Sequence, residues 1–158
     1  MPWFDRVFVS GEAGFLASEV CKQLRLRGVR LLNDELPKRL HRLSGVTEVA
    51  LFDDVTLSKL ADLCPTTIIH TAALVNTDKC ENFPLEAYEC NVRAAQRLAS
   101  LSKAYYVHFS TTAIYDPLAE RPLTTTSNIK PQTIYGQTKW YGELVTRELV
   151  PNQRLLVV

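Results

Sequence analysis

Tyr135 and Lys139 are the two side chains of this sequence best suited to proton transfer, because they stand four positions apart in Tyr-Gly-Gln-Thr-Lys. Positions i and i+4 of a helix share one face, so the phenol and the ammonium can point into the same site. A cation beside a phenol favours its ionised form, which makes the tyrosine a usable proton donor and acceptor near neutral pH. The spacing is common in ordinary amphipathic helices, so its meaning depends on the elements that precede it.

A glycine-rich turn near the N-terminus lies between a predicted strand and a predicted helix, in Ser-Gly-Glu-Ala-Gly-Phe-Leu-Ala. Gly11 allows a tight turn, and Gly14 lets the backbone approach a pyrophosphate. Phe15 and Leu16 then begin a helix whose N-terminal N–H groups favour a phosphate. The sequence therefore predicts a dinucleotide site, with a plain strand-to-helix turn as the alternative.

A cluster of hydroxyls follows a later apolar strand, in Val-His-Phe-Ser-Thr-Thr. Ligands of doubly wound sheets bind beyond the carboxyl ends of the strands, so Thr111 is expected where chemistry would take place. A Ser/Thr-rich loop that only caps the strand is the alternative.

Strands and helices alternate along the chain, which predicts an α/β fold: a Rossmann-like doubly wound parallel sheet with helices on both faces and strand order 3-2-1-4-5-6. We expect a single NAD(P)-binding domain over residues 1–158. Predicted strands lie near 6–10, 29–33, 47–52, 67–71, 105–110 and 154–158, and predicted helices near 14–27, 57–63, 84–102 and 135–149.

Taken together and in this order, the three motifs resemble those of the extended short-chain dehydrogenase/reductases. Within that family the similarity is greatest to dTDP-4-dehydrorhamnose reductase (RmlD-like) proteins and related NAD-dependent epimerases and dehydratases. The resemblance covers essentially the whole chain. It implies a dinucleotide-dependent enzyme that acts on a nucleotide-sugar carbonyl.

The resemblance also assigns roles to single residues of this sequence. It implies that Lys139 binds the nicotinamide ribose, that Thr111 orients the substrate carbonyl and that Tyr135 supplies the proton. The cofactor-binding residues it implies are Gly11, Gly14, Phe15, Leu16, Tyr135 and Lys139, with Asp54 and Val55 beside the adenine and Ala72 and Ala73 beside a ribose; Asn91 is implied in a proton relay, with a plain helix-surface or capping role as the alternative.

Three features depart from the family pattern. Ala17 ends the glycine motif where glycine is usual. Thr112 stands where many relatives have an aspartate that acts in sugar dehydration, which argues against dehydratase activity. Family members usually continue past a strand like that at 154–158, so we expect this chain to lack the substrate-binding part.

The choice between NAD and NADP stays open. Asp34, with Glu35 as the alternative register, is the acidic residue expected to bind the ribose of NAD. Lys38 and Arg39 follow closely and are suited to a 2′-phosphate.

The composition of the chain limits the classes of binding partner that we expect. A formal net charge of +1 gives no electrostatic reason to expect nucleic acid, and no apolar run approaches a membrane span. The four cysteines lack metal-binding or redox spacing, so no metal is expected and the thiols are expected to be reduced. With no recognisable signal peptide, this favours a cytoplasmic protein with a small-molecule substrate.

We expect an NAD(P)-dependent reductase in which a hydride passes to a nucleotide-sugar carbonyl and Tyr135 donates the proton. The alternatives are a non-catalytic dinucleotide-binding regulatory subunit and an inactive fragment of such an enzyme.

The segment 116–132 is interpreted as an active-site loop, with a connecting loop of no functional role as the alternative. A homodimer is expected through the helices near 84–102 and 135–149, with aggregation through the last strand as the competing outcome.

Overall fold

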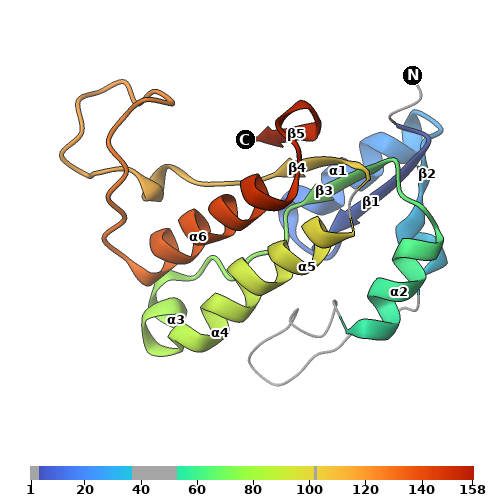
Figure 1. Ribbon diagram of the computed structural model, residues 1–158, viewed down its shortest axis with the longest axis horizontal. Coiled ribbons are helices and arrows are strands. Elements are labelled where there is room, and N and C mark those ends of the chain that lie inside the picture. Colours follow the sequence, from blue (N-terminus) through green and yellow to red (C-terminus); the bar gives the residue numbers. More distant parts are fainter. Residues whose placement is uncertain (1–3, 37–52, 102) are drawn as a thin grey trace.

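One parallel sheet forms the centre of the computed structural model, which describes residues 4–36, 53–101 and 103–158. Its strand order is β2–β1–β3–β4–β5 (Figure 1), and all four strand pairs are parallel. The predicted order is confirmed for these five strands, while the strand predicted over 47–52 lies outside the described residues. The strands are β1 (Arg6–Ser10), β2 (Arg30–Leu31), β3 (Thr67–His70), β4 (Tyr105–His108) and β5 (Leu155–Val157).

The register of the three central strands brings their carboxyl ends level. Ser10 of β1 pairs with His70 of β3, which pairs in turn with His108 of β4. The loops that leave these strands therefore start from the same edge of the sheet. This is the edge at which parallel α/β sheets bind their ligands.

Helices cover both faces of the sheet, as predicted. Successive residues of a strand point to opposite faces. In β1, Val7 and Val9 pack against α1 (Phe15–Leu26) through Cys21. Phe8 points to the other face, toward α2 (Asp54–Asp62), with which it shares a core through Leu60.

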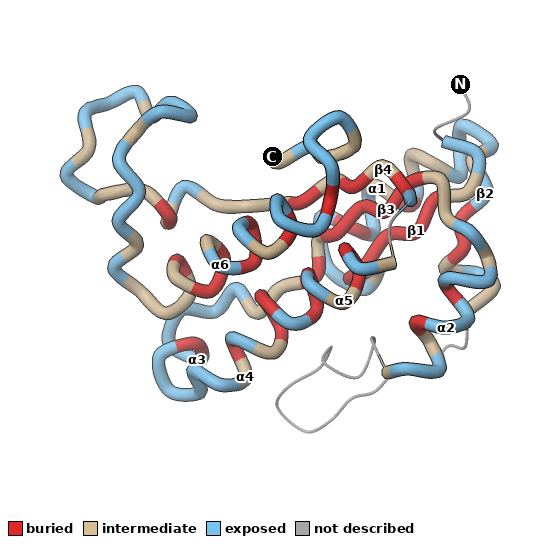
Figure 2. Tube along the Cα trace, viewed as in Figure 1, coloured by how far each residue is buried: buried red, intermediate tan, exposed pale blue. Residues whose placement is uncertain are grey.

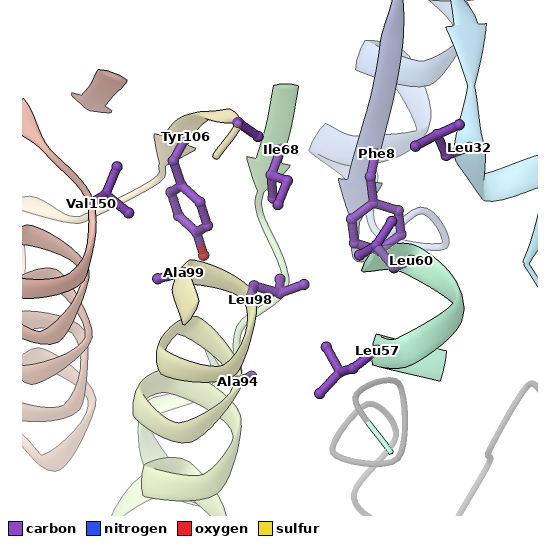
Figure 3. Packing of buried hydrophobic residues seen from close by; sticks show 11 residues of the cluster. Phe8, Leu32, Leu57, Leu60, Ile68, Ala94, Leu98, Ala99, Tyr106 and Val150 are labelled. Atoms are coloured by element: carbon purple, nitrogen blue, oxygen red, sulfur yellow. The ribbon is translucent and has the colours of Figure 1, made fainter. Parts of the chain in front are cut away.

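The second face carries the larger core. Tyr106 of β4, Ile68 of β3 and Val150 are fully or almost fully buried there, beside Leu98 of α5 (Ala94–Ser100) (Figure 3). Figure 2 shows the buried residues concentrated along β1, β3 and β4 and along the inner sides of α5 and α6 (Ile134–Leu149). The site described below thus rests on strands that are mostly buried.

The helix predicted over 84–102 is divided in the structure. It consists of α4 (Pro84–Tyr88), a π-helical turn η4 (Glu89–Arg93) and α5. A further short helix, α3 (Thr77–Asn82), precedes it, with its first turn capped by the Asn76 side chain. Helix α2 begins three residues before its predicted start because Asp53 accepts a hydrogen bond from the Thr56 N–H and caps it.

The segment predicted to be an active-site loop forms an excursion beyond the N-terminus of α6 (Figure 1). Its two arms are joined by an isolated antiparallel bridge between Tyr115 and Ile129. A hydrogen bond from the Asp116 N–H to the Asn128 carbonyl, 2.8 Å, adds to this pairing. Residues 116–132 are not among the described residues that line the cavity below.

Candidate active site

A cavity of about 520 Å³ opens at the carboxyl ends of β1, β3 and β4. Its walls come from four parts of the chain: the glycine turn with the first turn of α1, the loop after β3, the end of β4 and the first turns of α6. The described residues that line it are Gly11, Gly14, Phe15, Leu16, Ala17, Thr71, Ala72, Ala73, Leu74, Val75, Cys90, Phe109, Ser110, Tyr135 and Lys139.

The glycine turn is shaped by close contact with the loop after β3. Gly11 has φ +77°, and a Cβ atom there would stand 3.0 Å from the Ala72 Cα. Both features favour glycine at this position. The Gly14 N–H donates to the Gly11 carbonyl at 2.7 Å, and Gly14 is the N-cap residue of α1. The first turn of α1 thus faces the cavity without a side chain on its cap residue, an arrangement suited to an anionic group.

Ser10 fixes the loop after β3 beside the glycine turn. Its hydroxyl oxygen accepts from the N–H groups of Thr71 and Ala72, at 3.1 and 3.2 Å. The Thr71 hydroxyl donates back to the Ser10 carbonyl at 2.6 Å. Because these bonds join the ends of β1 and β3, the small residues Ala72 and Ala73 are held at the cavity wall.

Helix α6 brings Tyr135 and Lys139 to the same cavity, as the four-residue spacing predicts. The helix begins at a defined point, since the Thr133 hydroxyl caps the Gly136 N–H at 3.0 Å. Glu81 of α3 accepts from the Ile134 N–H at 2.7 Å. Tyr135 is therefore the second residue of a helix whose N-terminus is capped by two side chains, and Lys139 follows one turn later.

Lys139 is a buried ammonium with a backbone partner. Its Nζ atom donates to the Phe109 carbonyl at the end of β4. Burial lowers the pKa of the Lys139 ammonium to about 8, an effect that the negative charge of Glu143 opposes. The pKa of Lys139 therefore lies closer to neutral pH than that of an exposed lysine.

Two glycines let α6 approach the rest of the site. A Cβ atom at Gly136 would stand 2.5 Å from the Ala113 carbonyl oxygen, and one at Gly142 would stand 2.4 Å from the Asn91 carbonyl oxygen. Any side chain at either position would push the helix away from its neighbour. The positions of Tyr135 and Lys139 thus depend on glycine packing elsewhere on the helix.

Asn91 lies behind the cavity rather than on its wall. It accepts from the Leu74 N–H at 2.7 Å and donates to the Leu74 carbonyl at 3.1 Å. Its amide also donates to the Thr138 hydroxyl at 3.0 Å. The Asn91 side chain therefore joins the loop after β3 to α6, next to Lys139.

Thr111 is half-buried and caps a short 3-10 turn, η5 (Thr112–Ile114), by accepting from the Ala113 N–H at 3.2 Å. Among the described residues it is its neighbour Ser110 that lines the cavity. The strand end is thus where the sequence predicts it, but the hydroxyl on the wall belongs to the preceding residue.

Three residues predicted to bind the adenosine half are not among the described residues that line the cavity. Asp34 follows β2 and forms an ion pair with Arg25 at 2.8 Å. Asp54 is the first residue of α2 and pairs with Arg97 of α5, while Val55 beside it is 67% exposed. Each carboxylate has a basic partner that sequence spacing did not reveal.

Several wall residues were missed by sequence reasoning. Leu74 and Val75 extend the Ala72–Ala73 wall, and Cys90 reaches it from the π-helical turn. Phe109 and Ser110 precede the predicted Thr111. The signal available in the sequence was position alone, since all five lie within two positions of a predicted site residue.

The fold and this cavity define a class, the Rossmann-like α/β proteins with a glycine-rich strand-to-helix turn and a Tyr-x-x-x-Lys helix at one cavity. The family model described as "RmlD substrate binding domain" matches residues 5–158, so the chain belongs to that family. This confirms the resemblance drawn from the motifs.

Comparison with individual proteins and solved structures is consistent with this family assignment. The chain is 28% identical over 145 residues to the spore coat polysaccharide biosynthesis protein SpsK of Bacillus subtilis, a match covering 90% of this chain and 48% of SpsK. A dTDP-4-dehydrorhamnose reductase structure from Clostridium acetobutylicum superposes with a TM-score of 0.77 at 26% identity, over 96% of this chain and 51% of that protein. A dTDP-4-dehydrorhamnose reductase structure from Bacillus anthracis, solved with NADP, has a TM-score of 0.72 at 24% identity, over 97% and 52%.

Two further solved structures of similar fold, at 24% and 21% identity, were determined with NAD and with NADPH. The chain spans about half the length, or less, of the first curated relatives it matches. Among the described residues, no helix has both the length and the apolarity needed to cross a membrane.

Proposed function

We propose that the chain is the NAD(P)-binding domain of a nucleotide-sugar reductase. One observation carries this proposal: Tyr135 and Lys139 line the same cavity as Gly11 and Gly14. A proton-transfer pair and a phosphate-binding turn have no common use in a purely structural site. Reduction of a carbonyl beside a bound dinucleotide needs both.

The residues present fit a dinucleotide. The tight approach of Gly11 to Ala72 and the open first turn of α1 suit a pyrophosphate. The small side chains of Ala72 and Ala73 leave room for a ribose on the adjoining wall. The related structures with NADP, NAD and NADPH support NAD or NADP as the cofactor here.

The nicotinamide group would supply the hydride. In this scheme the Tyr135 hydroxyl donates its proton to the carbonyl oxygen of the substrate. The Lys139 ammonium binds ribose hydroxyls and stabilises the phenolate that remains. The Thr111 hydroxyl donates a hydrogen bond that orients the carbonyl.

Relatives support the substrate class. They are named dTDP-4-dehydrorhamnose reductase and dTDP-4-keto-6-deoxy-D-glucose reductase, and one related structure holds UDP-glucose. We propose a nucleotide-sugar substrate held partly by a segment outside this chain, since the chain spans about half of such relatives. We also propose a cytoplasmic location, in keeping with four free cysteines.

A turnover assay tests the proposal. This chain, and a longer form where one exists, would be mixed with NADH or NADPH and a dTDP-4-keto sugar, and cofactor oxidation followed. Tyr135→Phe removes only the proton donor and should lower the rate about a hundredfold or more. Equal rates for the wild type and Tyr135→Phe would show that the tyrosine has no catalytic role. Dinucleotide binding without turnover in either form would favour the regulatory-subunit alternative.

We further propose a homodimer through α4 and α6. These helices contact each other, and large apolar side chains remain exposed on both: Leu85 (72%) and Tyr88 (41%) on α4, Tyr141 (49%) and Leu144 (41%) on α6. Sedimentation should show a dimer at tens of micromolar that Leu144→Glu dissociates. A wild-type monomer would refute this, and a dimer insensitive to Leu144→Glu would move the interface elsewhere.

A further inference from the structure

Glu143 lies one helical turn beyond Lys139 on α6 and is almost fully buried, with only 4% of its surface exposed. Burying a carboxylate is costly unless its oxygens are satisfied. Here both are: Ser110 Oγ donates to Oε2 at 2.9 Å, and the Arg147 guanidinium donates to Oε1 at 2.8 and 2.9 Å. The Arg147 side chain is half exposed, so the buried Glu143 carboxylate forms its ion pair with a guanidinium that solvent reaches.

The Ser110 contact places Glu143 in the site. Ser110 lines the cavity, and the peptide bond that precedes it carries the Phe109 carbonyl that accepts from Lys139. Two residues on one face of α6 therefore bind the Phe109–Ser110 segment at the end of β4. Lys139 donates to the Phe109 carbonyl, and Glu143 accepts from the Ser110 hydroxyl. The Ser110 N–H is also fixed, by the Val158 carbonyl at 2.7 Å.

The charge of Glu143 also matters to Lys139. Among the described residues, Tyr135 and Cys90 line the same cavity as Lys139, and the ammonium interacts electrostatically with His70 on β3 and His108 on β4. Burial lowers the pKa of both histidines, so they are neutral near pH 7 and supply no counter-charge. Arg147 adds positive charge. Within the described residues, Glu143 is thus the negative charge that favours the charged form of Lys139, in addition to the hydrogen bond that the ammonium donates to the Phe109 carbonyl.

We propose that Glu143 is a positioning residue of this site: it holds the Phe109–Ser110 peptide in the orientation that receives Lys139, and its buried charge keeps Lys139 cationic. This inference rests on the proposed function only in calling the site a dinucleotide site. Its two parts, position and charge, are separable by substitution. A glutamine at this position can still accept from Ser110 but carries no charge, whereas a leucine can do neither.

The titration of Lys139 is the first measurement. The 158-residue chain would be labelled with ¹³C-lysine, and the Lys139 signal assigned by its loss in Lys139→Met. We expect a midpoint near pH 8 in the wild type. In Glu143→Gln the midpoint should fall by about one pH unit, as expected for loss of one buried opposite charge. The matched control is Glu148→Gln, the same chemical change at an exposed position of α6, which should leave the midpoint unchanged.

Calorimetric binding of NADH and NADPH is the second measurement. Glu143→Gln should bind like the wild type at pH 6.5, where Lys139 is protonated in both, and about threefold to tenfold more weakly at pH 8. Glu143→Leu should bind both dinucleotides more weakly than the wild type at pH 6.5 and at pH 8. If the role of Glu143 were purely structural, Glu143→Gln would lose the same affinity at both pH values.

The proposal is overturned if Glu143→Gln folds with an unchanged Lys139 midpoint and wild-type affinity at pH 8. Failure of Glu143→Leu to fold would leave Glu143→Gln as the deciding variant. The titration needs neither cofactor nor turnover. Absence of reductase activity would therefore count against the proposed function and leave this test intact.

Discussion

The Gly142 Cα faces the Asn91 carbonyl oxygen so closely that a Cβ atom at Gly142 would stand 2.4 Å from it. The oxygen belongs to the backbone of the π-helical turn η4, so it cannot rotate away as a side chain would. Gly142→Ala should therefore move α6 and destabilise the fold by about 1–3 kcal/mol, although alanine is the better helix former. Urea unfolding measures this, with Glu148→Ala on the exposed side of α6 as the control. An equal or higher unfolding midpoint for Gly142→Ala would show that the contact is not tight in solution.

Asn91 offers a second test of the same helix contact. Asn91→Asp keeps the shape of the side chain but removes the donor to the Leu74 carbonyl and the Thr138 hydroxyl. We expect a loss of about 1–3 kcal/mol in stability, the cost of leaving buried acceptors unsatisfied. Gln96→Glu makes the same amide-to-acid change at an exposed position of α5 and should be nearly neutral. Wild-type stability in Asn91→Asp would argue that the bonds are dispensable.

The buried histidines predict sensitivity to acid. Burial lowers the pKa of His108 to about 3, and His108 Nε2 has no hydrogen-bond partner within the described part of the chain. The unfolded chain binds a proton near pH 6.5, so stability is full above that pH and is lost as pH falls from 6.5 toward 3. At pH 5 the loss from His108 is about 2 kcal/mol relative to pH 7. In His108→Gln the difference between denaturation midpoints at pH 7 and pH 5 should shrink; an unchanged difference would contradict this assignment.

The sequence predicted the parts of the site that depend on local pattern. Gly11, Gly14, Tyr135 and Lys139 meet at one cavity because the turn and the helix face that carry them can be read from spacing. Ala72 joins them because it follows a strand whose carboxyl end shares the same sheet edge. These expectations required only the period of each element and the order of the strands.

Contacts between different helices, strands and loops could not be predicted from the sequence. Asp34 lies beside Arg25, and Asp54 beside Arg97, 43 positions away, and neither contact leaves a pattern in the sequence. Glu143 reads as an ordinary helix-surface residue until the end of β4 places Ser110 against it. The predicted 84–102 helix is likewise divided by a π-helical turn, and this turn packs against α6, a contact that local propensity does not reveal.

Binding of NAD(H) or NADP(H) to the cavity tests the account most directly, by calorimetric titration of the 158-residue chain with both dinucleotides. We predict measurable binding at millimolar dinucleotide or below. Gly14→Val should abolish it, because a Cβ atom at Gly14 already stands 3.1 Å from the Gly11 carbonyl oxygen and larger groups would fill the pyrophosphate position. Ala13→Val, an exposed neighbour in the same turn, should bind as the wild type does. No heat with either dinucleotide, or equal binding by folded Gly14→Val, would contradict the central claim that this cavity is a dinucleotide site.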